Sequence, residues 1–188
     1  MKLLKILSIL LMINLVTLTT AVYSAEAAPE AVIKLADELK SWGTNSTIIE
    51  AVKNQNSKAM TLASIKEMDS KWRNVSGLND EMKALMENSA AKEMLKMESS
   101  KAFYFEVFLM DNQGANVAMT NKTSDYWQGD EAKFIESYKD GNGAIHIGDV
   151  EFDESAQAYL VQVSIPVMDG GKAIGAMTIG VNVDELEN

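Results

Sequence analysis

The sequence predicts an α+β fold, with a long N-terminal helix packed on one face of a five-stranded antiparallel sheet. Two observations lead to this prediction. From residue 28 to about residue 97, apolar residues recur mostly at spacings of three and four, as they do on one face of a helix. From Phe103 onward the period changes to two, and several connections have the short length of hairpin turns, which join antiparallel strands.

Residues 1–27 have the three parts of a secretory signal peptide. Lys2 and Lys5 form a basic start, residues 6–22 carry no charge, and small residues follow as far as Ala27. We expect cleavage after Ala27, which would make the protein secreted and periplasmic. The alternative is an uncleaved anchor in the inner membrane with the protein facing the periplasm, because the apolar run approaches the roughly 20 residues of a membrane span.

Residues 28–57 predict an N-terminal helical segment. Pro29 suits the first turn of a helix, Trp42-Gly43 interrupts the segment, and Thr44 or Asn45 can cap the helix that follows. Two further apolar stripes lie at 62–72 and 82–97, and methionine is frequent between residues 60 and 97. We interpret these methionines as flexible core residues rather than copper ligands, because no His or Cys accompanies them.

The second half of the chain predicts strands with turn residues between them. A polar insertion at 123–131 and a short helix around Phe134 separate the second strand from the third, and an acidic loop at 149–155 precedes the fourth. The expected strands are 103–110, 116–120, 144–147, 158–165 and 173–181.

Composition excludes several classes of function. A net charge of −10 and the small number of basic residues argue against nucleic acid as a partner. The absence of cysteine excludes disulfides and thiol nucleophiles, and a single histidine argues against a His-based metal site, so we expect neither a cofactor nor a metal. A hydrolase using the carboxylates of Asp125, Asp130, Glu131 or Glu154 is an alternative, but no spacing is diagnostic. We therefore expect a protein that is not an enzyme.

Several runs of residues together resemble a known family. They include Met68-Asp-Ser-Lys-Trp-Arg73, Asp125-Tyr-Trp-Gln-Gly-Asp-Glu131, Val161-Gln-Val-Ser-Ile-Pro166 and Ile174-Gly-Ala-Met-Thr-Ile-Gly180. With the order of the elements, residues 58–188 resemble a single-Cache (PDC-type, PAS-like) sensor domain, as in stand-alone periplasmic sensor proteins of proteobacteria. The resemblance implies a small-molecule sensor in signal transduction, usually fused to a chemoreceptor or kinase. Because no output domain follows in this sequence, we expect the signal to pass through a separate membrane-bound kinase, cyclase or chemoreceptor. The alternative is a soluble periplasmic interaction protein with no small ligand.

The resemblance also implies that the ligand lies on the sheet face opposite the long helix, beneath the insertion. On that face the strand alternation places Glu106, Gln162 and Thr178. A buried polar group costs about 1–3 kcal/mol when it has no partner, so these three would contact a ligand or pair with one another or with solvent.

The insertion supplies further candidates for ligand binding. Tyr126 and Trp127 can form flat apolar walls, while Gln128 and Asp130 can make directed polar contacts. The alternative is that Trp127 anchors the loop and Asp130 caps the following helix. From the preceding helix, Trp72 and Arg73 can face the same pocket, where Arg73 could pair with a carboxylate, so a small carboxylate or an amino acid is the expected ligand.

One acidic segment offers a different site. Asp149, Asp153 and Glu154 could bind a hard cation such as calcium, but we interpret them as a solvated acidic loop.

Overall fold

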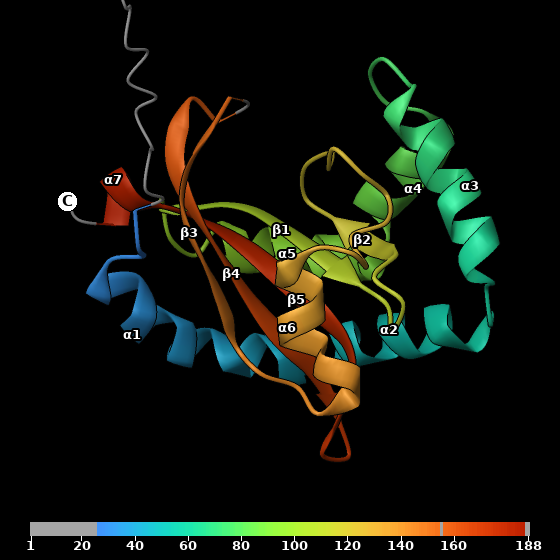
Figure 1. The fold of residues 1–188 in the computed structure, drawn as a ribbon, viewed down its shortest axis with the longest axis horizontal. Coiled ribbons are helices and arrows are strands. Elements are labelled where there is room, and N and C mark those ends of the chain that lie inside the picture. The colour runs from blue at the N-terminus through green and yellow to red at the C-terminus, as the bar shows by residue number, and fades with distance from the viewer. Residues whose placement is uncertain (1–25, 155, 187–188) are drawn as a thin grey trace, which may run out of the picture.

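The computed structural model describes residues 26–154 and 156–186 (Figure 1). The basic start and the apolar run of the predicted signal peptide lie outside these residues, so their prediction is untested. Within the described part of the chain, no helix combines the length and the apolar character that crossing a bilayer requires.

A single five-stranded antiparallel sheet forms the centre of the fold, as predicted. Its order is β2-β1-β5-β4-β3, so the last strand of the chain lies in the middle, where both neighbours bury it. The strands are β1 (Tyr104–Met110), β2 (Asn116–Met119), β3 (His146–Asp153), β4 (Ala158–Asp169) and β5 (Lys172–Asn182).

The prediction of an acidic loop at 149–155 was wrong for most of its length. β3 continues to Asp153, with Glu151 paired to Leu160 and Phe152 to Tyr159. Pairing with the long strand β4 satisfies the backbone here, and this tertiary context outweighs the low strand propensity of acidic residues.

The N-terminal helical segment covers one face of the sheet. The expected long helix is two helices, α1 (Glu30–Leu39) and α2 (Ser46–Ser57), joined by the 3₁₀ turn η1 (Lys40–Thr44) at the predicted interruption. Gly43 is needed there because a Cβ at this position would lie 2.2 Å from the Pro166 carbonyl oxygen of β4. Asn45 then caps α2, since its side chain accepts hydrogen bonds from the amides of Thr47 and Ile48.

Two hydrophobic cores lie on the two faces of the sheet. The first joins α1, α2 and α5 (Ser89–Glu98) to the sheet, and includes Leu39, Ile48, Val52, Met94, Leu109, Val163 and Ile179. The second joins the opposite face to α3 (Leu62–Arg73), α4 (Asp80–Glu87) and α6 (Ala132–Tyr138), and includes Ile65, Trp72, Met82, Phe108, Tyr126 and Phe134. Met82 and Met94 are completely buried, which confirms the core interpretation for these two methionines. The short elements η2 (Lys139–Gly141) and α7 (Val183–Leu186) follow α6 and β5 (Figure 1).

A β-bulge changes which residues of β1 face the helices. The register shifts between Tyr104 and Glu106, so Tyr104 packs edge-on against Trp42 of η1, with ring centroids 5.0 Å apart. Strict alternation along β1 would put Tyr104 on the same face as Glu106, but the bulge places it against the first core. Beyond the bulge the alternation holds: Val107 lies in the first core and Phe108 in the second.

Candidate functional site

A cavity of about 350 Å³ lies on the sheet face that carries the second core. It is enclosed by α3, β1, β4, the start of α6 and the insertion that follows β2. Five of the predicted site residues line it, namely Trp72, Arg73, Glu106, Gln128 and Gln162. The other lining residues are Phe108, Lys122, Thr123, Ser124, Lys133 and Asp153. The sequence thus places residues from four separate segments around one cavity.

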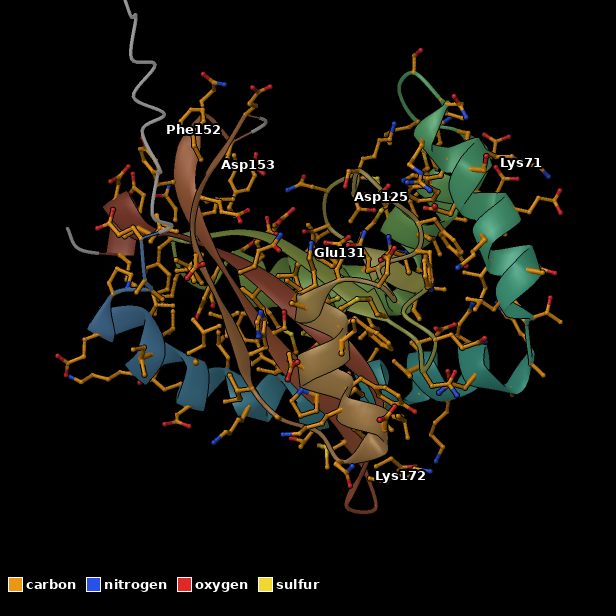
Figure 2. All side chains as sticks on the ribbon, viewed as in Figure 1. Lys71, Asp125, Glu131, Phe152, Asp153 and Lys172 are labelled. Atoms are coloured by element: carbon orange, nitrogen blue, oxygen red, sulfur yellow. The ribbon has the colours of Figure 1, made fainter. Side chains whose placement is uncertain are left out.

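Two further hollows adjoin this cavity. One shares Lys133, Asp153 and Gln162 with it, and extends along β3 past Phe152. The other shares Arg73 and is lined by Trp127 and Asp130 of the insertion. Figure 2 labels Asp153, Asp125 and Glu131, which belong to β3, the insertion and the start of α6 in this region.

Glu106 and Gln162 contact each other in the wall of the cavity. The Gln162 amide nitrogen donates a hydrogen bond to Glu106 Oε1 at 3.1 Å. The two residues lie on β1 and β4, and both have Gly180 of the central strand β5 as their cross-strand neighbour. A Cβ at Gly180 would lie 2.7 Å from Glu106 Cγ, so the glycine makes the space in which the glutamate side chain crosses β5.

Gly180 was missed as a site residue, although a glycine inside a predicted strand is a known sign of close approach.

The environment of Glu106 is unfavourable for its charge. Burial raises the pKa of the Glu106 carboxyl above its usual value, whereas the hydrogen bond from Gln162 lowers it. Asp153 raises this pKa further, and Lys133 acts weakly in the opposite direction.

Asp69 of α3 holds the insertion in place. Its Oδ1 accepts hydrogen bonds from the backbone amides of Tyr126 at 2.9 Å and Trp127 at 3.1 Å. Its Oδ2 accepts a hydrogen bond from Arg73, one turn further along the helix. Arg73 Nε also lies 3.4 Å from Asp125 Oδ1, so the carboxylates of Asp69 and Asp125 together hold the Arg73 guanidinium at the edge of the cavity. Sequence reasoning assigned no role to Asp69; the spacing of four to Arg73 was the available signal.

Trp72 and Tyr126 are core residues that pack on each other, with ring centroids 5.5 Å apart. The Trp72 indole nitrogen donates to the Thr123 carbonyl at 2.9 Å, so this ring can offer a ligand only apolar contact. Tyr126 does not line the cavity, and burial raises its pKa to about 12.

Trp127 fits the anchor interpretation better than the wall interpretation. Its indole nitrogen donates to the Gln113 carbonyl at 2.8 Å, and the Lys66 ammonium lies 4.3 Å from its ring centroid. The ring lines the adjoining hollow rather than the cavity. Ligand contact by Tyr126 and Trp127 stays a prediction.

Gln128 and Asp130, two residues apart in the insertion, have opposite surroundings. Gln128 is only 1% exposed, its amide nitrogen donates to the Asp125 carbonyl at 2.9 Å, and its Oε1 has no partner within the described part of the protein. Asp130 is exposed, and α6 begins beside Glu131 with no side-chain cap. The alternative in which Asp130 caps this helix was therefore wrong.

Thr178 lies in β5 below the cavity and does not line it. Its hydroxyl and that of Ser164 are 2.8 Å apart and completely buried, so Thr178 is satisfied by a partner on β4. Two of the four carboxylates considered for hydrolysis are also engaged: Asp125 pairs with Arg73, and Glu131 with Lys133 at 2.8 Å.

Comparison with known proteins gave matches among solved structures, whereas no family model and no curated protein matches the chain. The sensor domain of the V. cholerae histidine kinase DctB is 12% identical, with a TM-score of 0.43 over 84% of this chain. The sensory domain of the Campylobacter jejuni chemoreceptor Tlp3 with isoleucine bound is 15% identical, with a TM-score of 0.42 over 85% of this chain. The ligand-binding domain of the Pseudomonas aeruginosa chemoreceptor PctC with GABA is 11% identical, with a TM-score of 0.42 over 81% of this chain.

The matched regions span 53%, 64% and 62% of those three solved chains. All three are sensor or ligand-binding domains.

Proposed function

We propose that this chain is an extracytoplasmic sensor domain that binds a small molecule in the cavity between α3, the insertion and the sheet. The observation that carries the proposal is a buried acceptor without a partner: Gln128 lines the cavity, and its Oε1 receives no hydrogen bond from the described residues. Buried polar groups are normally paired, so such an acceptor suits a ligand donor. The volume of about 350 Å³ lies in the range of small-molecule sites.

The lining combines apolar surface with charges of both signs. Trp72 and Phe108 supply the apolar part, Arg73 and Lys133 are cationic, and Glu106 is acidic. A few polar groups set among aromatic rings orient a small ligand. This combination supports a small polar molecule, such as an amino acid or a small carboxylate.

The output is the second part of the proposal. We propose that ligand binding is passed to a separate membrane-bound kinase, cyclase or chemoreceptor in a periplasmic setting. The support is the signal-peptide pattern of residues 1–27 and the resemblance of residues 58–188 to sensor domains that are usually fused to such proteins.

A thermal-shift screen of the mature chain tests the binding step. Amino acids, small carboxylates, amines and purines are added to residues 28–188, and a compound that binds only the folded state raises Tm. Any hit is then measured by calorimetry against Gln162→Ala, in the wall of the cavity, and Lys92→Ala, an exposed lysine on α5.

We expect the first substitution to weaken binding and the second to leave it unchanged. The proposal would be contradicted if no compound of any class raised Tm. It would also be contradicted if substitutions at several residues that line the cavity left the affinity for a hit equal to that of the wild type.

A further inference from the structure

The hydrogen-bonding groups that the cavity leaves open are acceptors. Gln128 Oε1 is buried without a partner, and the orientation of this amide is set by the Asp125 carbonyl, which needs the nitrogen as its donor. Glu106 accepts a side-chain hydrogen bond from Gln162, although an ionised carboxylate can accept about four.

The cations around the cavity already have partners in the protein. Arg73 lies between Asp69 and Asp125. Lys133 pairs with Glu131 at 2.8 Å, and its ammonium lies over the Phe108 ring. The Lys122 ammonium donates to the Val75 carbonyl at 2.9 Å.

Glu106, in contrast, forms no ion pair with a cation of the described chain. The Lys122 ammonium is exposed to solvent, so among the described charges held away from bulk water it is the Glu106 carboxylate that has no counter-ion. An uncompensated anion out of bulk water is unfavourable, and a cation brought beside it removes that penalty.

We propose that the cavity selects a ligand that carries a positively charged nitrogen, whose N–H groups donate hydrogen bonds to the Glu106 carboxylate and to Gln128 Oε1. This inference rests on the proposed function and names the ligand group that the site recognises. An ammonium group has donors and no acceptor, which matches two open acceptors, and a hydrogen bond between ionised partners is about twice as strong as a neutral one. Gly180 leaves room for the Glu106 side chain in the cavity, since any side chain at residue 180 would displace it.

Binding of such a ligand is linked to a proton. Burial raises the pKa of the Glu106 carboxyl, so part of the free protein is protonated at this position at mildly acidic pH. The groups that act on Glu106 or share its cavity are Gln162, Asp153, Lys133, Glu98, Arg73 and Lys122.

A cation favours the ionised carboxylate, so it expels this proton when it binds. Affinity then rises by up to about ten-fold per pH unit until Glu106 is ionised in the free protein, and is level above that pH.

The test uses three probes with one carbon skeleton: L-valine, isobutylamine, which lacks the carboxylate, and isovalerate, which lacks the amine. Binding to residues 28–188 is measured by calorimetry in a pH series from about pH 4 to about pH 8, which starts in the ordinary carboxyl range and extends upward because the pKa of Glu106 is raised. The variants are Glu106→Gln, Glu106→Asp and the control Glu50→Gln, an exposed carboxylate of α2 that lines neither the cavity nor the adjoining hollows.

We expect both amines to bind, isovalerate not to bind, and affinity for the amines to rise with pH. Glu106→Gln should reduce their affinity at least about ten-fold at about pH 8 and abolish the pH dependence, whereas Glu106→Asp, which keeps the charge, should retain part of both. Glu50→Gln should behave as wild type. Circular dichroism of each variant shows whether it is folded.

Several results would overturn the inference. If isovalerate binds and the amines do not, or if Glu106→Gln binds the amines like the wild type, the cation is not recognised by Glu106, although small-molecule binding stands. The same holds if the thermal-shift screen yields only compounds without a cationic nitrogen. If no compound of any class raises Tm, both the inference and the proposed function are wrong.

Discussion

Replacing Asp69 should reveal how strongly the insertion depends on a single buried carboxylate. Asp69 is 2% exposed and accepts two backbone N–H groups and one guanidinium N–H. Asp69→Ala leaves the amides of Tyr126 and Trp127 without this acceptor, and each buried unpaired donor costs about 1–3 kcal/mol. Arg73 is 59% exposed and keeps Asp125 as a partner, so the two unpaired amides dominate, and we expect a total loss of about 4 kcal/mol.

Urea denaturation measures this loss directly. With a slope of about 2 kcal/mol/M for a domain of this size, a loss of about 4 kcal/mol lowers the midpoint by about 2 M. Hydrogen exchange should show faster exchange at the amides of Tyr126 and Trp127, because these two donors lose their acceptor.

Two matched variants separate the contributions of Asp69. Arg73→Ala keeps both backbone hydrogen bonds and removes a side chain that is 59% exposed, so about 1 kcal/mol is expected. Asp69→Asn keeps an acceptor for the amides but turns donors toward Arg73, so its loss should lie between the other two. If Asp69→Ala destabilises no more than Arg73→Ala does, the backbone hydrogen bonds are not what holds the insertion, and the reasoning fails.

Three other changes test the cavity and its support. Gly180→Ala should leave the fold intact, with a urea midpoint close to that of the wild type. It should weaken the binding of any screened ligand, measured by calorimetry, because the new methyl group displaces the Glu106 side chain. Unchanged affinity would refute the role of Gly180 in making space for Glu106. Because the folded-state pKa of Glu106 is raised, wild-type stability should fall as pH rises from the unfolded carboxyl value of about 4 through the folded value. Glu106→Gln should therefore gain stability over wild type across that range, and a difference in urea midpoint that is constant with pH would contradict this. Trp127→Ala should lower the free energy of unfolding by about 2–3 kcal/mol, less than the loss of a fully buried tryptophan, and should leave ligand affinity nearly unchanged. A large loss of affinity with a small loss of stability would instead indicate that Trp127 contacts the ligand.

The alternation of strand residues was enough to predict much of the cavity. Because successive side chains in a strand point to opposite faces, Glu106 and Gln162 could be assigned to the face away from the N-terminal helices. The same rule failed at Tyr104, since a β-bulge adds a residue and reverses the alternation. It also gave no warning that β3 would extend through its acidic residues, because pairing with β4 decided that.

The sequence by itself determined the α+β class, the strands and the segments that approach the cavity, because these follow from hydrophobic periodicity and turn residues, which are local properties. Only the tertiary structure decided the roles inside the insertion. An irregular loop has no period, so nothing local distinguishes buried Gln128, with its open acceptor, from exposed Asp130. The partners of Asp69 lie 57 and 58 residues away, and Gly180 matters only because Glu106 crosses it from another strand. Such contacts arise from packing between distant segments, which residue spacing along one chain does not encode.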